Sequence, residues 1–299
     1  MFSAISNRDA ELMNRPAKIP RVWPTFAFPV LVAAAACFFA SSSAQAGRSC
    51  EVRKTTPETV QRSLGLAEKT LASLNASGAK VVVLARAGQD LSKYGLHYSH
   101  LGFAYQQADS QGEVVWRVLH KLNECGTAES AIYRQGLGEF FLSDVWRYEA
   151  EWLAFTPEVQ ERLWVLLQDP ARSISLSHKP YSVVSYAWGL KYQQSNQWAI
   201  ETLAAAMEPA SIAGRDSVDA RRKAAQAWLH FKDFEPSALT ILPLTRLGAR
   251  ATAANVAFDD HPNEKRFSNR IETVTVDSVF DWLQRSGLAR SAPPTVIEY

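Results

Sequence analysis

The chain has 299 residues, of which 47% are apolar, and its 32 basic and 30 acidic residues give a formal net charge of +2. A chain of this size and composition can bury one large core, or at most two small ones. The balanced charge excludes proteins that hold nucleic acid or an anionic membrane surface through a strongly basic domain. We therefore expect no nucleic-acid partner.

The N-terminus has the pattern of a cleavable secretory signal. Residues 26–40 are apolar and uncharged, and residues 44–46 read Ala-Gln-Ala, the small-x-small pattern of a cleavage site. The alternative is an uncleaved membrane anchor, but the apolar run is shorter than the roughly 20 residues that span a bilayer, and Pro29 interrupts it. Four basic residues precede the run: Arg8, Arg15, Lys18 and Arg21. We expect residues 1–46 to be a signal peptide that is removed before Gly47.

The mature chain is then residues 47–299, which we interpret as a single α+β domain. It contains equal numbers of basic and acidic residues, and it has no second long apolar run. We therefore expect a periplasmic or secreted protein whose mature form has no transmembrane segment.

Two of the three cysteines remain after the signal peptide is removed. Cys37 lies in the signal, whereas Cys50 and Cys125 form an even pair in an oxidising compartment, where a disulfide is the usual outcome. The competing interpretation is that Cys125 is a free nucleophile, because a single cysteine among histidines is a common catalytic arrangement. We favour the disulfide, which would tether the mature N-terminus.

The first half of the mature chain predicts one helix and three strands. Residues 56–58 read Thr-Pro-Glu, an N-cap followed by proline and an acid, so a helix should begin there and end near residue 75. Residues 81–85 form a short valine-rich run typical of a strand buried on both faces. Strands at 98–105 and 114–122 follow, separated by a turn, and residues 131–148 are aromatic and irregular. This half predicts a three-stranded antiparallel core.

The second half predicts mainly helices. We expect helices at 157–168, from about 196 to 207, at 218–231 and at 278–285, and a strand-like segment at 181–188. Residues 246–257 are rich in glycine and alanine, and residues 259–262 form an acidic loop. The predicted fold is an antiparallel sheet core with flanking helices.

Two histidines interrupt the apolar pattern of the predicted strands. His100 lies in Ser-His-Leu-Gly-Phe and His120 in Val-Leu-His-Lys-Leu. They could be a general base and the residue that orients it. The alternative is a pair of core imidazoles that bond to backbone carbonyls. The signatures of P-loop, dinucleotide-binding, serine-elbow and zinc-protease sites are missing, so we expect no metal and no cofactor.

Six segments resemble the bacterial family known as domain of unknown function 2145. They span most of the mature chain: YSHLGFAY at 98–105, LNECGT at 122–127, YRQGL at 133–137, YQQSNQW at 192–198, RLGAR at 246–250 and FDDHP at 258–262. The resemblance implies membership of a family with no established activity.

A more distant resemblance links the chain to circularly permuted papain-like hydrolases and acyltransferases, including the lecithin retinol acyltransferase group. That resemblance implies that His100 is the base, that His120 orients it and that a helix-opening cysteine attacks an amide or ester. Ser195 stands at the position of that cysteine. A serine must lose its proton to the base during attack, so the chain would be a serine variant or an inactive relative. The simpler interpretation is that Ser195 is a helix N-cap.

Other polar residues could hold a ligand. Arg134 and Arg250 could clamp a carboxylate or phosphate, as could Arg246, although surface ion pairs explain arginines equally well. Asn196 follows Ser195 at the predicted helix start and is a further candidate. The run Asp259-Asp260-His261 could bind a metal, but adjacent side chains rarely converge on one ion, which favours a solvated or capping loop.

Two functions are consistent with these patterns. One is an amide or ester hydrolase, or an acyltransferase-like enzyme, that acts on cell-envelope material. The other is a non-catalytic periplasmic binding or structural protein with the same fold. The ligand in either case would be a small molecule, a peptide or a lipid.

The signal-peptide interpretation predicts the N-terminus of the exported protein. N-terminal sequencing of protein from the periplasmic fraction should read Gly-Arg-Ser-Cys, because cleavage follows Ala46. Recovery of residues 24–40 in a membrane fraction would instead establish an anchor.

Overall fold

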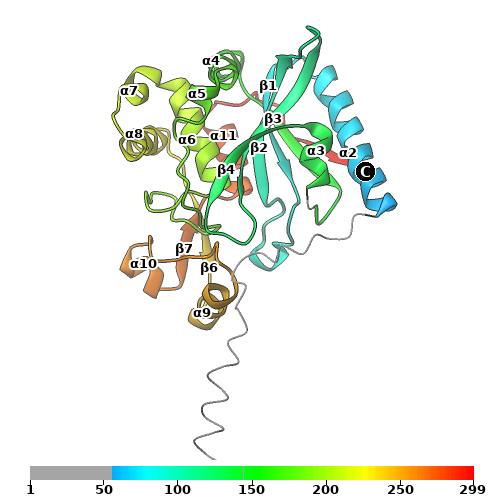
Figure 1. The fold of residues 1–299 in the computed structure, drawn as a ribbon. Helices are drawn as coiled ribbons and strands as arrows, with labels where there is room; N and C mark the ends of the chain where they lie inside the picture. The colour runs from blue at the N-terminus through cyan, green and yellow to red at the C-terminus, as the bar shows by residue number, and fades with distance from the viewer. Residues whose placement is uncertain (1–55, 144) are drawn as a thin grey trace, which may run out of the picture. The chain divides into compact units, whose positions relative to one another are not determined.

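A computed structural model describes residues 56–143 and 145–299, all within one compact unit that spans residues 44–299. Its centre is a six-stranded sheet in which every neighbouring pair is antiparallel, with the order β4-β3-β2-β1-β5-β8 (Figure 1). The strands are β1 (Val81–Arg86), β2 (His100–Ala108), β3 (Val114–Asn123), β4 (Ser130–Gly136), β5 (Glu149–Ala154) and β8 (Thr295–Glu298). The predicted α+β class and antiparallel core are confirmed. The predicted signal peptide and Cys50 lie outside the described residues.

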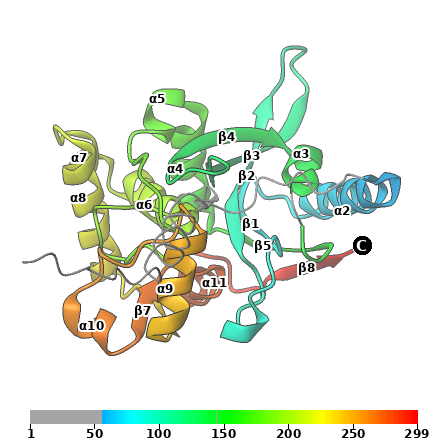
Figure 2. The same cartoon turned by 60° about the horizontal axis from the view of Figure 1, so that its bottom comes forward.

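Helices cover both faces of this sheet (Figures 1 and 2). We call the side covered by α2 (Pro57–Ala76) and α3 (Leu137–Leu142) the α2 face. On the opposite side, the α6 face, α4 (Pro157–Gln168) and α6 (Ser195–Met207) pack against the sheet, and α8 (Val218–Phe231) and α11 (Val276–Arg285) pack against α6. Short helices α5 (Pro170–Ser173) and α7 (Pro209–Ala213) connect these elements, and a 3-10 turn, η1 (Ser92–Tyr94), precedes β2.

Strand alternation divides the core into two layers. Successive side chains of a strand point to opposite faces. Val82, Ala104 and Val118 therefore pack in the cluster on the α2 face, whereas Phe103 and Leu119 pack in the cluster on the α6 face. All six residues of β1 are buried, because β1 lies between β2 and β5 and both of its faces are covered. The valine-rich run at 81–85 predicted this position correctly.

Most of the predicted helices are confirmed because their end signals are local. Thr56 caps α2 through its side chain, which accepts from the Thr59 amide, and Thr59 reciprocates. Thr275 caps α11 in the same way with Ser278. The helices at 157–168 and 218–231 have the predicted bounds.

Two predicted segments are wrong. The supposedly irregular stretch 131–148 contains most of β4 and all of α3. β4 is an edge strand with only β3 as a partner, and several of its side chains are exposed, so no apolar run marks it. The supposed strand at 181–188 is a series of turns, held by backbone bonds from Val183 to Asn255 and from Ala187 to Glu272. Its buried side chains pack against other parts of the domain and do not form one face of a sheet.

The region after α8 forms a small second layer. A two-stranded sheet pairs β6 (Ser237–Thr240) with β7 (Arg270–Thr273), and α9 (Pro243–Thr252) and α10 (Asn263–Phe267) lie beside it (Figures 1 and 2). The sequence did not predict these four elements, because β6, β7 and α10 have only four or five residues each and α9 has no buried residue. Within the described residues no helix is both long and apolar enough to cross a bilayer.

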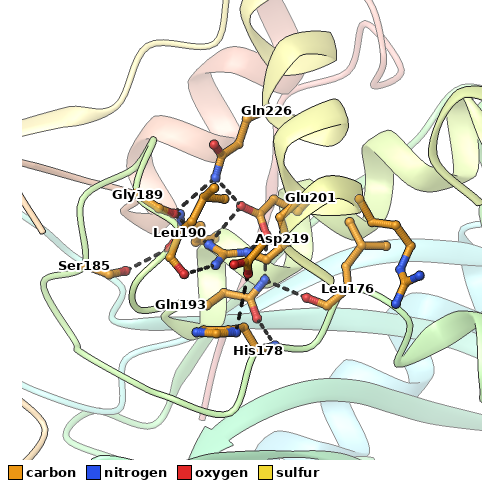
Figure 3. A network of polar contacts seen from close by, with 12 residues as sticks. Leu176, His178, Ser185, Gly189, Leu190, Gln193, Glu201, Asp219 and Gln226 are labelled. Carbon is orange, nitrogen blue, oxygen red and sulfur yellow. Dashed lines mark hydrogen bonds and ion pairs between the residues drawn. The ribbon is translucent and has the colours of Figure 1, made fainter. Parts of the chain in front are cut away.

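A fully buried ion pair fixes the irregular chain between α5 and α6 (Figure 3). The guanidinium of Arg222 donates to the carboxylate of Glu201 at 2.8 Å and 3.2 Å, and neither side chain is exposed. The same guanidinium donates to the carbonyl oxygens of Gly189, Leu190 and Tyr192. These carbonyls have no sheet partner, so Arg222 supplies the donors that a buried irregular backbone requires.

Amide side chains complete this network. Gln226 donates to Glu201 at 2.8 Å, and Gln193 points toward the same carboxylate (Figure 3). The ammonium of Lys121, on β3, donates to the Gln193 side chain at 2.7 Å and to the His178 carbonyl at 2.6 Å. The pKa of Lys121 is lowered to about 7, chiefly by burial and in part by the nearby Arg222, against the opposing effect of Glu201. The network thus connects the sheet, α6, α8 and the loop between them.

Breaking the ion pair from one side should strongly destabilise the domain. Arg222→Met leaves the Glu201 carboxylate buried without its cation, which costs about 3–5 kcal/mol of unfolding free energy. The double variant Arg222→Met, Glu201→Leu should recover part of the loss, because no uncompensated charge remains. Lys179→Met is the control, since its pair with Glu129 is exposed on both sides. Urea unfolding measures all three, and a single-variant loss no larger than the control's contradicts the assignment.

Candidate functional site

A large pocket opens between the six-stranded sheet and the small region formed by β6, β7 and α9. Its volume is about 810 Å³, and its walls come from α2, β1, β2, the loop after β3, the N-terminus of α6, β6 and α9. Most of its lining is apolar and includes the side chains of Tyr94, Leu96, Tyr98, Leu122, Val145, Tyr181, Val183, Val184, Leu239, Ile241 and Phe258. Polar lining residues include Arg86 and His100 from the ends of β1 and β2, and Gln194, Ser195 and Asn196 from the start of α6. The pocket is thus a largely apolar chamber with two groups of polar residues.

The two histidines predicted as a pair are hydrogen-bonded to each other. His100 is the first residue of β2, and its Nε2 lies 2.8 Å from Nδ1 of His120 on β3. The other nitrogen of His120 lies 2.8 Å from Oε1 of Gln135 on β4, and Gln135 donates to Glu139 of α3 at 3.0 Å. The result is a chain of four polar side chains that runs from the pocket wall to α3.

The direction of these bonds fixes the positions of the protons. Gln135 uses its amide nitrogen on Glu139, so its oxygen must accept from Nε2–H of His120. His120 therefore carries its lone pair on Nδ1 and accepts from Nε2–H of His100. When both rings are neutral, His100 holds its own unprotonated nitrogen at Nδ1. This tautomer is the one that a base oriented by a partner requires.

His120 stays neutral over the ordinary pH range. Its ring is fully buried, and burial lowers its pKa to about 3, with a smaller contribution from the positive charge of Arg86. The hydrogen bond that His120 donates to Gln135 opposes this shift only in part. The ring also packs edge-on against Phe140 of α3, with centroids 5.2 Å apart. His120 is therefore an orienting residue and not itself a proton carrier.

Gly102 makes the histidine contact possible. It lies between the two rings on the α2 face, directly opposite His120 in the sheet register. A Cβ at position 102 would lie 2.8 Å from the Cβ of His120 and 3.0 Å from Val118 Cγ1. Only glycine leaves room for the two rings to meet diagonally across it. The glycine of the Ser-His-Leu-Gly-Phe segment was therefore the sequence signal for this contact.

Ser195 lies on the other side of the sheet from the histidine rings. Both rings project on the α2 face, toward Phe140, whereas Ser195 begins α6, which packs on the α6 face. The Ser195 hydroxyl lies 3.3 Å from the hydroxyl of Tyr181. Among the described residues, no hydrogen bond joins Ser195 to either histidine. The two groups share the pocket but do not form a catalytic pair here, so a catalytic role for Ser195 stays a prediction.

The helix cap at this position belongs to the preceding residue. Gln194, not Ser195, is the N-cap of α6, and its side-chain oxygen accepts from the Asn196 amide at 3.1 Å. The N-cap interpretation of Ser195 is therefore wrong by one residue. Ser195 is the first helical residue, and its side chain does not cap the helix.

The predicted ligand-binding residues are not gathered together. Asn196 lines the pocket, but its amide bonds to the Leu101 N–H and the Val274 carbonyl, which fixes α6 to its neighbours. Arg134 is exposed on β4 and donates to the Leu167 carbonyl, and Arg250 is exposed on α9. Neither arginine belongs to the pocket lining. The Asn196 side chain thus has a structural role, and a ligand would have to share it with these two hydrogen bonds.

The acidic loop at residues 259–262 has a structural role. Asp260 accepts from the Tyr186 amide at 2.7 Å and lies 3.0 Å from Nδ1 of His261, and the His261 ring bonds to the Glu272 carbonyl. Asp259 pairs with Lys191 at 2.6 Å. No group of three or more potential metal ligands occurs in the part of the chain that the structure describes. The loop anchors the turns of 181–191 against β7, in line with the capping interpretation.

Cys125 lines the pocket in the loop after β3. Its predicted partner, Cys50, lies outside the described residues, so the disulfide stays a prediction.

Sequence reasoning missed the outer half of the polar chain. Gln135 and Glu139 fall in the stretch that was expected to be irregular, and Arg86 ends a strand that otherwise reads as plain core. The guanidinium of Arg86 donates to the Phe140 carbonyl and lies 4.7 Å from the centre of its ring. A charged residue at the end of an otherwise apolar strand was the available signal.

Fold and site together define an α+β protein with an apolar pocket and a buried histidine chain on its wall. A family model described as "Uncharacterized protein conserved in bacteria (DUF2145)" matches residues 73–283, and the chain belongs to this family. No curated protein and no solved structure matches the chain.

The lowered pKa of His120 predicts a specific loss of stability in acid. The pKa of an unfolded histidine is about 6.5, so between pH 6.5 and 3 the unfolded chain binds more protons at this ring than the folded chain does. Stability is therefore complete above pH 6.5 and falls on acidification, by up to about 1.4 kcal/mol per pH unit from this ring. His120→Asn should remove that part of the slope.

Urea unfolding at several pH values between 6.5 and 4.5 measures the effect. The control Gln111→Asn changes no titratable group and lies in the exposed turn before β3, so its slope should follow that of the parent protein. Parallel curves for the parent and His120→Asn would show that His120 is protonated in the folded state.

Proposed function

We propose that the protein is an exported binding protein that holds a largely apolar small molecule in the pocket between β1, β2, α6 and α9. The observation that carries the proposal is the pocket itself. Its volume of about 810 Å³ falls within the range of small-molecule sites, and a largely apolar lining with a few polar groups is the usual composition of such sites.

The lining indicates the chemical class of the ligand. Aromatic and aliphatic side chains from four separate connecting segments surround the chamber, including Tyr98, Tyr181, Ile241 and Phe258. A peptide would bring many backbone donors and acceptors that such a lining cannot satisfy. An apolar molecule with one polar end, such as a fatty acid or a lipid fragment, matches a chamber that is apolar over most of its lining and polar at Arg86 and His100. The polar end would lie beside His100.

Export is the second part of the proposal. Residues 1–46 have the basic flank, apolar run and cleavage pattern of a signal peptide. A periplasmic location would also bring the protein to the envelope, where molecules of this class occur. The disulfide between Cys50 and Cys125 belongs to the same proposal, because it requires an oxidising compartment.

A second candidate function rests on the histidine chain. A hydrogen-bonded chain of His100, His120, Gln135 and Glu139, buried over its first three members, is the geometry of an oriented base, and Ser195 lines the same pocket. The resemblance to permuted papain-like hydrolases would make this an esterase or amidase. We rank it second, because the structure shows no hydrogen bond between the base and a serine.

Filling the pocket should abolish binding without unfolding the protein. Ala249→Trp places a large ring at the pocket wall, and we expect at least a tenfold weaker affinity for palmitic acid, measured by displacement of a fluorescent fatty acid. The matched control is Ala227→Trp, at an exposed position of another helix, α8. Equal affinity in both variants, or no binding by the parent protein, contradicts the binding proposal.

The two functions separate in one further measurement. The parent protein and His100→Ala are assayed with p-nitrophenyl esters of increasing acyl length. The binding proposal expects no turnover that depends on His100. Turnover in the parent that His100→Ala abolishes, with fatty-acid affinity retained, would replace the binding function by the esterase.

A further inference from the structure

Helix α9 presents its apolar side outward. Leu244 is 82% exposed and Leu247 is 67% exposed, and no residue of the helix is buried. Thr245 and Ala249, one turn apart on the opposite side, line the pocket. A surface helix normally buries its apolar stripe and exposes its polar side. In α9 the arrangement is reversed.

Neighbouring residues extend this apolar surface. Leu242, the residue before α9, is 58% exposed, and Phe267, the last residue of α10, is 69% exposed. Arg246 of α9 donates to the Arg266 carbonyl, so the end of α10 lies against α9. We call Leu242, Leu244, Leu247 and Phe267 the α9 face. Large apolar side chains grouped in this way mark a surface that another molecule covers.

The charge of α9 indicates which kind of molecule covers the α9 face. The mature chain is neutral overall, but the ten residues of α9 include Arg246 and Arg250 and no acid. On a helical projection the two arginines lie on one turn-to-turn row at the border of the leucine side. Leucines flanked by arginines are typical of short helices that lie in the interface of an anionic bilayer, where the apolar side enters the acyl boundary and the arginines meet phosphates.

We propose that the α9 face docks onto the surface of an anionic phospholipid bilayer. Docking would place the pocket wall formed by Thr245 and Ala249 directly behind the lipid contact. The inference goes beyond the ligand-binding function and does not depend on it, because it rests on the outer side of α9 rather than on the pocket.

Vesicle flotation tests the proposal with the exported form of the full chain, so that the apolar leader is not present. The vesicles contain phosphatidylglycerol and phosphatidylethanolamine, or phosphatidylcholine alone. We expect the parent protein to bind the anionic vesicles at least tenfold more strongly than the neutral ones. Leu244→Glu, Leu247→Glu should lose at least tenfold of that binding, and Arg250→Glu should lose the preference for phosphatidylglycerol.

Two controls keep the result specific. Phe231→Glu changes a residue that is 77% exposed on α8, away from α9, and should bind vesicles as the parent does. Circular dichroism should show unchanged melting for all variants, because none of the changed residues is buried. Absence of vesicle binding by the parent overturns the proposal. So does self-association in light scattering that the leucine variant abolishes, which would make a second copy of the chain the occupant.

Discussion

The pocket depends on the buried ion pair between Arg222 and Glu201. The chain from about residue 174 to 194 has no regular structure, yet it forms one wall of the chamber and leads directly into α6. Arg222 donates to three of its backbone oxygens, and within the described part of the chain the oxygens of Leu190 and Tyr192 have no other donor. A guanidinium can satisfy several carbonyls at once because its donors lie in a fixed plane. Arg222, held in place by Glu201, therefore supplies hydrogen bonds that a neighbouring strand supplies to the backbone in a sheet.

Local signals account for what could be predicted from the sequence. α2 and α4 begin with a threonine followed by proline, and β1 is a valine run, so neighbouring residues alone specify them. β4 could not be recognised, because an edge strand with exposed side chains lacks both an apolar run and strict alternation. The turns at 181–188 were mistaken for a strand because their buried side chains serve tertiary contacts, which the sequence does not reveal.

The candidate site was predictable in part for the same reason. His100 and His120 meet because both project on one face and Gly102 separates them, and spacing along two neighbouring strands contains that information. Which helical layer covers that face depends on the packing of the whole domain. Ser195 was therefore placed at the correct helix start, but the layer of that helix could not be deduced. Gln135 and Glu139, the other two members of the hydrogen-bonded chain, lie on β4 and α3. Neither element was recognised in the sequence, so these residues were missed.

The packing of β8 against α2 has a consequence for the edge of the sheet. β8 is the edge strand beside β5, and a side chain at Gly65 of α2 would collide with the ring of Tyr299. A larger residue at position 65 would therefore have to displace that ring, which follows β8 directly. Loss of β8 would expose the backbone donors and acceptors of β5, and an unpaired strand edge of this kind can pair with another chain. One glycine on a helix thus protects the sheet from edge-to-edge association.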